Sequence, residues 1–193
     1  MKTVLISAAL ATFALTASAQ GQDTRPVRAL VGLGLTFGGD KLATADFIDG
    51  SRESIRSGGL FTLYAGAEFR VSDVMAIQAT FGYHADSTSA ASNGSLRFSR
   101  YPLDLLALYS ISDKVRLGGG VEFVNNPKVA GSGDLRNINV GFKNSTGLVL
   151  EGEYLFTPRF GAKARVAAHE FESKASGEKV DGNYVGLMLN YYF

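Results

Sequence analysis

Apolar side chains recur at every second position in segments spread along most of the chain. The pattern is clearest at residues 183–193, where every odd position from 185 onward is apolar or aromatic. These residues are Val185, Leu187, Leu189, Tyr191 and Phe193. Successive side chains of a β-strand point to opposite faces, so this spacing predicts a strand with one apolar face and one smaller, more polar face.

Earlier segments alternate in the same way and predict further strands. Including the last, the predicted strands cover approximately residues 28–38, 60–70, 75–84, 101–109, 116–123, 148–154, 162–169 and 183–193. In the fourth, Leu96 and Phe98 fall outside the apolar phase, which predicts a bulge near Arg100 with Pro102 beside it. The sequence therefore predicts an all-β protein.

The connections between these strands alternate strictly in length. Short turns are predicted at 71–73, 111–114 and 156–159, and longer polar loops at 39–59, 85–95, 125–144 and 172–182. All long loops then lie at one end of the sheet and all short turns at the other, with both chain ends on the short-turn side. This arrangement is typical of outer-membrane barrels, which have short periplasmic turns and long external loops.

Aromatic residues in the apolar phase gather near both ends of the strands, as in the two aromatic girdles of membrane barrels. They are Phe69, Tyr109, Tyr154 and Tyr191 at the short-turn end, and Phe37, Phe61, Tyr83, Tyr101 and Phe123 at the long-loop end. We therefore expect an eight-stranded antiparallel up-and-down transmembrane β-barrel. A soluble barrel or sandwich that buries the apolar phase and exposes the charged one has the same alternation and stays open as an alternative.

The first residues have the features of a secretory signal. Lys2 precedes the apolar stretch Val4–Leu15, and Ala17-Ser18-Ala19 supplies the small residues that a signal peptidase accepts. The alternative, a membrane anchor, requires about 20 apolar residues. The sequence predicts a cleavable signal peptide over residues 1–19 and one barrel domain over residues 20–193.

Composition narrows the classes of function. The chain has no cysteine, so disulfides and thiolate metal sites are unavailable, and its net charge of +1 argues against nucleic acid as a partner. It has 23 glycines and only 4 prolines, which suits many strands and turns. No feature of the sequence indicates a cofactor.

The phase opposite the apolar one carries equal numbers of acids and bases. The acids are Glu68, Asp104, Glu122, Glu151 and Glu153, and the bases are Arg70, Arg100, Arg116, Lys163 and Arg165. The interior of an eight-stranded barrel is just wide enough for side chains to fill, and charges buried there are costly unless paired. We expect a salt-bridged plug without an open pore. The functional alternative is a proton relay or a selectivity filter.

The candidates for catalysis are few. His84 and His169 both map to the long-loop ends of strands in the inward phase, and Asp86 and Ser87 follow His84. A nucleophile needs a base within hydrogen-bond reach and a third group that orients the base, and no such spacing is present. Two histidines without further ligands also make a weak metal site. We predict neither an enzyme nor a metal protein.

The segments YPLDLLALY (101–109) and NYVGLMLNYYF (183–193), with the strand count and turn alternation, resemble the small eight-stranded outer-membrane proteins, the group containing OmpX, NspA and the OmpA barrel. The final stripe Val185, Leu187, Leu189, Tyr191 and Phe193 resembles the terminal assembly signal of such proteins. The resemblance implies a Gram-negative outer-membrane location, lipid and lipopolysaccharide as surroundings, and insertion by periplasmic chaperones and the barrel-assembly machinery. It also implies a monomer.

The same resemblance implies a structural or surface-interaction role through the external loops. The runner-up is a site or conduit for small hydrophobic ligands, because the first and third long loops carry apolar residues. These are Phe47, Ile48, Leu135, Ile138, Val140 and Phe142. They can equally pack the loops together. A lipid-modifying enzyme of the outer membrane is a third, weaker hypothesis.

Overall fold

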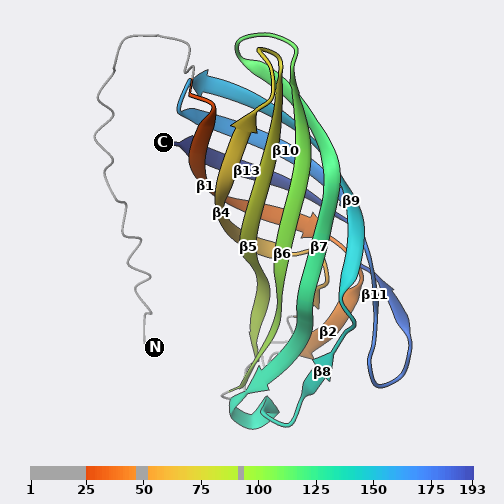
Figure 1. Cartoon of the computed structure of the whole chain (residues 1–193). Helices are drawn as coiled ribbons and strands as arrows, with labels where there is room; N and C mark the ends of the chain where they lie inside the picture. The colour runs from red at the N-terminus through yellow and green to blue at the C-terminus, as the bar shows by residue number, and fades with distance from the viewer. Residues whose placement is uncertain (1–24, 47–51, 91–93) are drawn as a thin grey trace, which may run out of the picture.

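The computed structural model describes residues 25–46, 52–90 and 94–193, which form a long β-barrel (Figure 1). The predicted signal peptide, Phe47 and Ile48 lie outside the described residues. The barrel strands are β1 (Val27–Gly38), β4 (Leu60–Arg70), β5 (Met75–Ala90), β6 (Gly94–Ser110), β7 (Val115–Ser132), β9 (Ser145–Thr157), β10 (Phe160–Ala168) and β13 (Tyr184–Tyr192). Each strand pairs antiparallel with the next one in this order.

The first and last strands close the barrel. β13 pairs antiparallel with β1, with Leu187 opposite Leu35. The backbone N–H of Phe193 also donates to the carbonyl of Ala29 at 3.0 Å. Closure leaves no unpaired sheet edge toward lipid, which a spanning β-structure requires. The predicted eight-stranded up-and-down barrel is therefore confirmed.

The apolar phase faces outward and the charged phase faces inward. Leu150 is 68% exposed and Leu187 67%, whereas Lys163 is 1% exposed and Glu122 is fully buried. A soluble barrel would show the reverse, so the structure excludes that alternative. In the part of the chain that the structure describes, no helix is long and apolar enough to cross a membrane.

Each of the three short turns places a hydroxyl at the same position. In every turn, the side-chain oxygen of a Ser or Thr accepts a hydrogen bond from the backbone N–H three residues later. These bonds join Met75 N to Ser72 Oγ (3.1 Å), Val115 N to Ser112 Oγ (3.1 Å) and Phe160 N to Thr157 Oγ1 (3.0 Å). The repeated contact fixes the turns locally, and through them the register of the paired strands.

The long-loop end contains more strand than the sequence predicted. β5, β6 and β7 continue through much of the predicted loops 85–95 and 125–144, and form the lower end of the molecule in Figure 1. Shorter elements surround them: β2 (Lys41–Asp46), β3 (Arg52–Arg56), a 3-10 turn (Gly133–Leu135), β8 (Asn139–Gly141), β11 (Glu170–Glu172) and β12 (Lys179–Asp181). The loop prediction was wrong there, because polar residues of strands beyond the membrane read like loop residues.

The bulge predicted near Arg100 lies on the neighbouring strand. The register of β6 with β7 shifts between Ser99 and Tyr101, and the one extra residue belongs to β7. There, Asn126 adopts a positive φ of 49°. Asparagine tolerates this left-handed backbone better than most residues, which explains its position at the bulge.

Leu96 and Phe98 need no bulge of their own. They continue the inward phase of β6 and pack into an apolar cluster that fills the barrel's external end. Its members, which we call the external cap, are Ile55, Leu96, Phe98, Val124, Val129, Phe142 and Phe171. Three of its aromatic rings, from Phe98, Phe142 and Phe171, lie with centroids 5.9–6.4 Å apart. The cap separates the polar interior from the external surface.

Candidate functional site

Near the short-turn end, Arg116 bridges two buried carboxylates. Its Nη1 donates to both oxygens of Glu68 at 3.0 Å, and its Nε donates to Glu153 Oε2 at 2.9 Å. Its Nη2 donates to the hydroxyl of Tyr192 (2.7 Å), which donates to Glu153 Oε1 (2.6 Å). Arg28 adds a second cation to Glu68 at 2.7 Å and covers the Tyr192 ring, 4.1 Å from its centroid.

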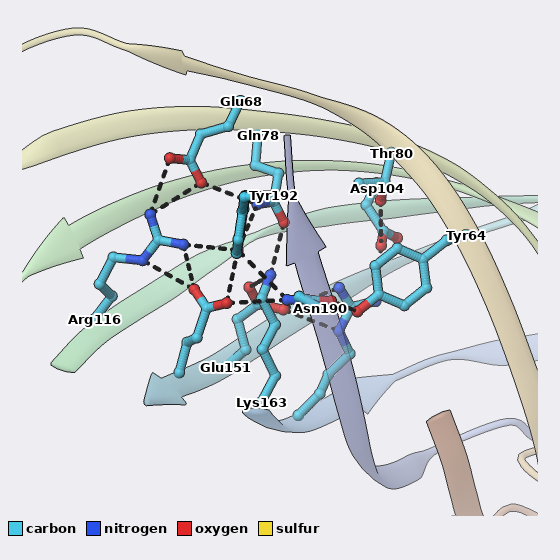
Figure 2. A network of polar contacts seen from close by, with 12 residues as sticks. Tyr64, Glu68, Gln78, Thr80, Asp104, Arg116, Glu151, Lys163, Asn190 and Tyr192 are labelled. Carbon is cyan, nitrogen blue, oxygen red and sulfur yellow. Dashed lines mark hydrogen bonds and ion pairs between the residues drawn. The ribbon is translucent and has the colours of Figure 1, made fainter. Parts of the chain in front are cut away.

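The middle of the barrel holds a continuous chain of ion pairs, part of which Figure 2 shows. Lys163 Nζ donates to Glu151 Oε1 (2.6 Å) and to Gln78 Oε1 (2.7 Å). Arg165 donates to the other oxygen of Glu151 through Nη2 (2.9 Å) and to Asp104 Oδ2 through Nη1 (2.8 Å). Gln78 also donates to Glu68, which Arg116 binds near the short-turn end. The groups near the short-turn end and in the middle of the barrel therefore form one network.

Toward the external end, Glu122 is the centre of a third group. The hydroxyl of Tyr184 donates to its Oε2 at 2.6 Å, and Nε2 of His169 lies 3.0 Å from its Oε1. Arg165 Nη1 is 3.5 Å from Oε2 and links this group to the middle of the barrel. The rings of His169 and Tyr184 are stacked, with an angle of 2° between their planes and 6.3 Å between their centroids.

His84 lies between Arg100 and Thr36, fully inside the barrel. Arg100 donates to His84 Nδ1 from Nε (3.1 Å) and Nη2 (2.7 Å), and to the carbonyl of Ser57 from Nη1 (2.8 Å). Since Nδ1 accepts, a neutral imidazole carries its proton on Nε2 and donates it to Thr36 Oγ1 at 2.6 Å. The imidazole is therefore held as a hydrogen-bond donor toward Thr36 and is unable to remove the proton from that hydroxyl.

Within the described ranges, every buried carboxylate has an ion pair. The pairs link Glu68 to Arg116, Asp104 to Arg165, Glu122 to Arg165, Glu151 to Lys163 and Glu153 to Arg116. Burial of an unpaired carboxylate costs several kcal/mol, so this pairing is a condition for filling the lumen with charged groups.

All the interior charges predicted from the sequence are buried except one. The buried residues are Glu68, Arg100, Asp104, Arg116, Glu122, Glu151, Glu153, Lys163 and Arg165. Arg70 is exposed, because it is the last residue of β4 and lies at the rim of the barrel, directly before a short turn. Arg28 takes the place inside the barrel that the sequence predicted for Arg70. The phase of the first strand could have indicated Arg28, which shares the inward positions of Gly32 and Gly34.

Sequence reasoning also missed polar residues of the last strand. Tyr184, Asn190 and Tyr192 are buried at 4% exposure or less and join the network through Glu122 and Glu153. Their even numbering was the available signal. The outward phase of the same strand holds Val185, Leu187, Leu189, Tyr191 and Phe193, whose side chains lie on the lipid-facing surface.

The next question is whether a substrate or a metal ion could reach the titratable side chains of the barrel interior. The histidines are buried below the external cap, and among the described residues no group of three or more His, Cys, Asp or Glu side chains could hold a metal ion. A cavity of about 610 Å³ at the short-turn mouth is lined by Arg28, Glu68 and Arg116 and by turn residues. Arg28 and Arg116 both bind Glu68, so the cavity borders the network.

Comparison with known proteins agrees with this geometry. A family model described as the outer membrane protein beta-barrel domain matches residues 5–193. The search of curated proteins finds no match.

Solved structures share the fold at low identity. Ail, the attachment invasion locus protein of Yersinia pestis, crystallised with the heparin analogue sucrose octasulfate, is 13% identical with a TM-score of 0.55, covering 86% of this chain and 97% of its own. Neisserial surface protein A is 12% identical with a TM-score of 0.50, covering 88% of this chain and 98% of its own. The match of the family model over nearly the whole sequence shows that this chain belongs to the outer membrane protein beta-barrel family and resides in the outer membrane.

Proposed function

We propose that the protein is a sealed outer-membrane barrel that acts through its external surface, with the interior charges serving as a structural plug. The observation that carries the proposal is the filled lumen. Each buried carboxylate is paired, and the external cap closes the barrel above the network. A conduit for solutes needs a continuous open path, which this packing does not leave among the described residues.

The surface beyond the cap is the part available to partners. β5, β6 and β7 extend past the outward aromatic residues Tyr101 and Phe123 and carry exposed polar positions to Ser132. The hairpin of β11 and β12 projects beside them (Figure 1). Loops held on a rigid barrel are where binding surfaces usually lie, so these strands and the hairpin are the proposed contact region.

Two other hypotheses receive less support. Of the residues named for a hydrophobic-ligand site, Phe142 is 4% exposed and packs against the rings of Phe98 and Phe171, and Leu135 packs against the same cluster, which favours loop packing. Ile138 and Val140 are each 37% exposed. A lipid-modifying activity requires a base, whereas Nδ1 of His84 accepts from Arg100 and its Nε2 is held as a donor toward Thr36. We therefore propose a protein without enzymatic activity, inserted as a monomer by the barrel-assembly machinery after escort by periplasmic chaperones.

A cell-surface assay tests the role directly. A strain lacking the gene and the same strain complemented with the full chain are compared for attachment to an immobilised sulfated polysaccharide and to a plain surface. The sulfated probe is chosen because Ail was crystallised with a heparin analogue. Attachment should fall in the deletion strain and return on complementation.

A matched variant separates surface contact from barrel integrity. Residues 175–178, at the exposed tip between β11 and β12, are replaced by a short glycine-rich turn, which leaves the cap and the interior in place. Uptake of a small hydrophilic solute is measured in the same strains. If the deletion strain takes up less solute than the complemented strain while its attachment is unchanged, the proposal is refuted.

A further inference from the structure

A cluster of cations lies on the outer wall just beyond the external aromatic residues. In the pairing of β6 with β7, Ser99 is opposite Lys128 and Arg97 is opposite Ala130. Cross-strand partners and alternate residues share a face, so Arg97, Ser99 and Lys128 all lie on the same side of the sheet. The opposite side carries Phe98, which is buried in the external cap. Arg97 and Lys128 therefore point outward.

The bulge in β7 produces this orientation. Val124 faces inward before the bulge, and Val129 faces inward after it. The two residues are five positions apart, whereas residues on one face of a regular strand are separated by an even number. Without the extra residue at Asn126, strict alternation would turn Lys128 into the cap and Val129 outward. The strained backbone position thus places a cation on the outer wall.

A third cation reaches the same place from another segment. Gly141 of β8 pairs with Lys128. Lys174 donates its backbone N–H to the Gly141 carbonyl at 3.0 Å. The Cδ of Lys174 lies 3.6 Å from where a Cβ of Gly141 would stand, so its stem runs over this bare glycine next to Lys128.

These cations have no acid to neutralise them in the part of the chain that is described. The nearby Glu172 is bound by Lys143 at 2.6 Å, and the hydrogen bond from Lys143 lowers the pKa of that carboxyl. Glu170 is bound in the same way by Lys179 at 2.7 Å. Arg97, Lys128 and Lys174 form no ion pair with a described carboxylate, so their charge is available to an external anion.

The height of the cluster on the barrel indicates which anion. Tyr101 and Phe123 mark the external girdle, where lipid tails give way to headgroups. At a rise of about 3.3 Å per residue, Ser99 and its partner Lys128 lie about 7 Å farther along the strands than Tyr101, and Arg97 lies about 13 Å farther than Tyr101. This is the layer of lipid headgroups rather than the tip of the molecule.

We propose that Arg97, Lys128 and Lys174 bind the phosphate groups of an anionic outer-leaflet lipid that carries phosphate on a sugar headgroup, as lipopolysaccharide does. The guanidinium offers paired donors that match phosphate geometry, and the two ammonium groups add charge beside it. This contact goes beyond the proposed surface role, because it concerns the lipid around the barrel and not a partner at its tip.

The test uses the mature protein folded in detergent micelles and titrated with bis-phosphorylated lipid A, with bound lipid counted by native mass spectrometry. Dephosphorylated lipid A is the matched probe. The wild type should prefer the phosphorylated form, and the variant Arg97→Gln/Lys128→Gln/Lys174→Gln should lose about tenfold or more in affinity for it, as expected when charge-assisted hydrogen bonds are removed.

Arg136→Gln is the control variant, because it removes an exposed cation at the 3-10 turn, farther from the aromatic girdle. It should keep the wild-type preference. Equal binding of both lipids by the wild type, or an unchanged preference in the triple variant, would overturn the proposal. Binding of soluble heparin is measured for the same proteins. If the triple variant loses heparin binding but keeps its binding of phosphorylated lipid A, the proposal is overturned and the cluster is assigned to a soluble polyanion. Heat-dependent gel migration verifies that every variant is folded.

Discussion

Lys163 Nζ lies 2.6 Å from Glu151 Oε1, and neither side chain exposes any surface. Removing one partner of such a buried pair leaves an uncompensated charge. Lys163→Met should therefore reduce the free energy of unfolding by about 3 kcal/mol, measured by urea titration of the folded barrel in detergent.

The exposed pair of Lys179 with Glu170 is the matched control, since its distance of 2.7 Å is nearly the same while both side chains are more than half exposed. Lys179→Met should leave the free energy of unfolding nearly unchanged, because solvent screens an exposed pair. Equal losses from the two substitutions would show that burial does not decide the stability of these pairs.

Arg116 and Arg70 lie near the same end of the barrel but in different surroundings. Arg116→Ala leaves Glu68 and Glu153 short of a partner and should cost about 3–5 kcal/mol. Arg70→Ala alters an exposed side chain and should cost less than about 1 kcal/mol. The temperature at which unboiled protein changes its gel migration reports both effects, and a larger loss from Arg70→Ala would contradict the assignment.

Tyr184→Phe deletes only the hydroxyl that donates to Glu122. The carboxylate keeps its contacts with His169 and Arg165, but loses a charge-assisted bond in a site without solvent. We expect a loss of about 1.5–3 kcal/mol in denaturant titration. Tyr191→Phe, the same change on the outward phase of β13, should be nearly neutral. A neutral Tyr184→Phe would show that the hydroxyl is dispensable to the plug.

Purified protein should give no sustained single-channel steps in planar bilayers. The reason is the paired network together with the external cap, which fill the lumen from Arg116 to Phe98. Stable, reproducible conductance from the wild type would mean that the plug opens, and would favour the relay or filter hypothesis.

Deletion of Phe193 should affect assembly more than stability. Its side chain is 52% exposed and its N–H bonds to Ala29, so a folded barrel loses little without it. If the residue belongs to an assembly signal, the shortened protein should fail to reach the outer membrane in cells and still refold in detergent. Normal outer-membrane levels after deletion would make Phe193 an ordinary girdle residue.

The sequence by itself determined the class of fold and most of the contents of the lumen. Alternation at period two assigns each residue of a strand to one of two phases, and the regular change of short and long connections orders the strands. That was enough to predict an eight-stranded barrel and to place Glu122, Lys163 and Arg165 in one phase. Local spacing carries this information because it depends only on backbone geometry.

Only the tertiary structure decided which phase faces lipid and which charges meet. Arg165 contacts Asp104, and Arg116 contacts Glu68, across strands distant in sequence, because the strand stagger sets which inward residues share a level. The same stagger leaves Arg70 at the rim. The bulge at Asn126 also depends on tertiary structure, because a bulge exists only relative to the strand with which β7 pairs. Period-two spacing indicates which face of the sheet a residue lies on, but not its height along the barrel axis. These contacts therefore form only when the sheet closes into a barrel.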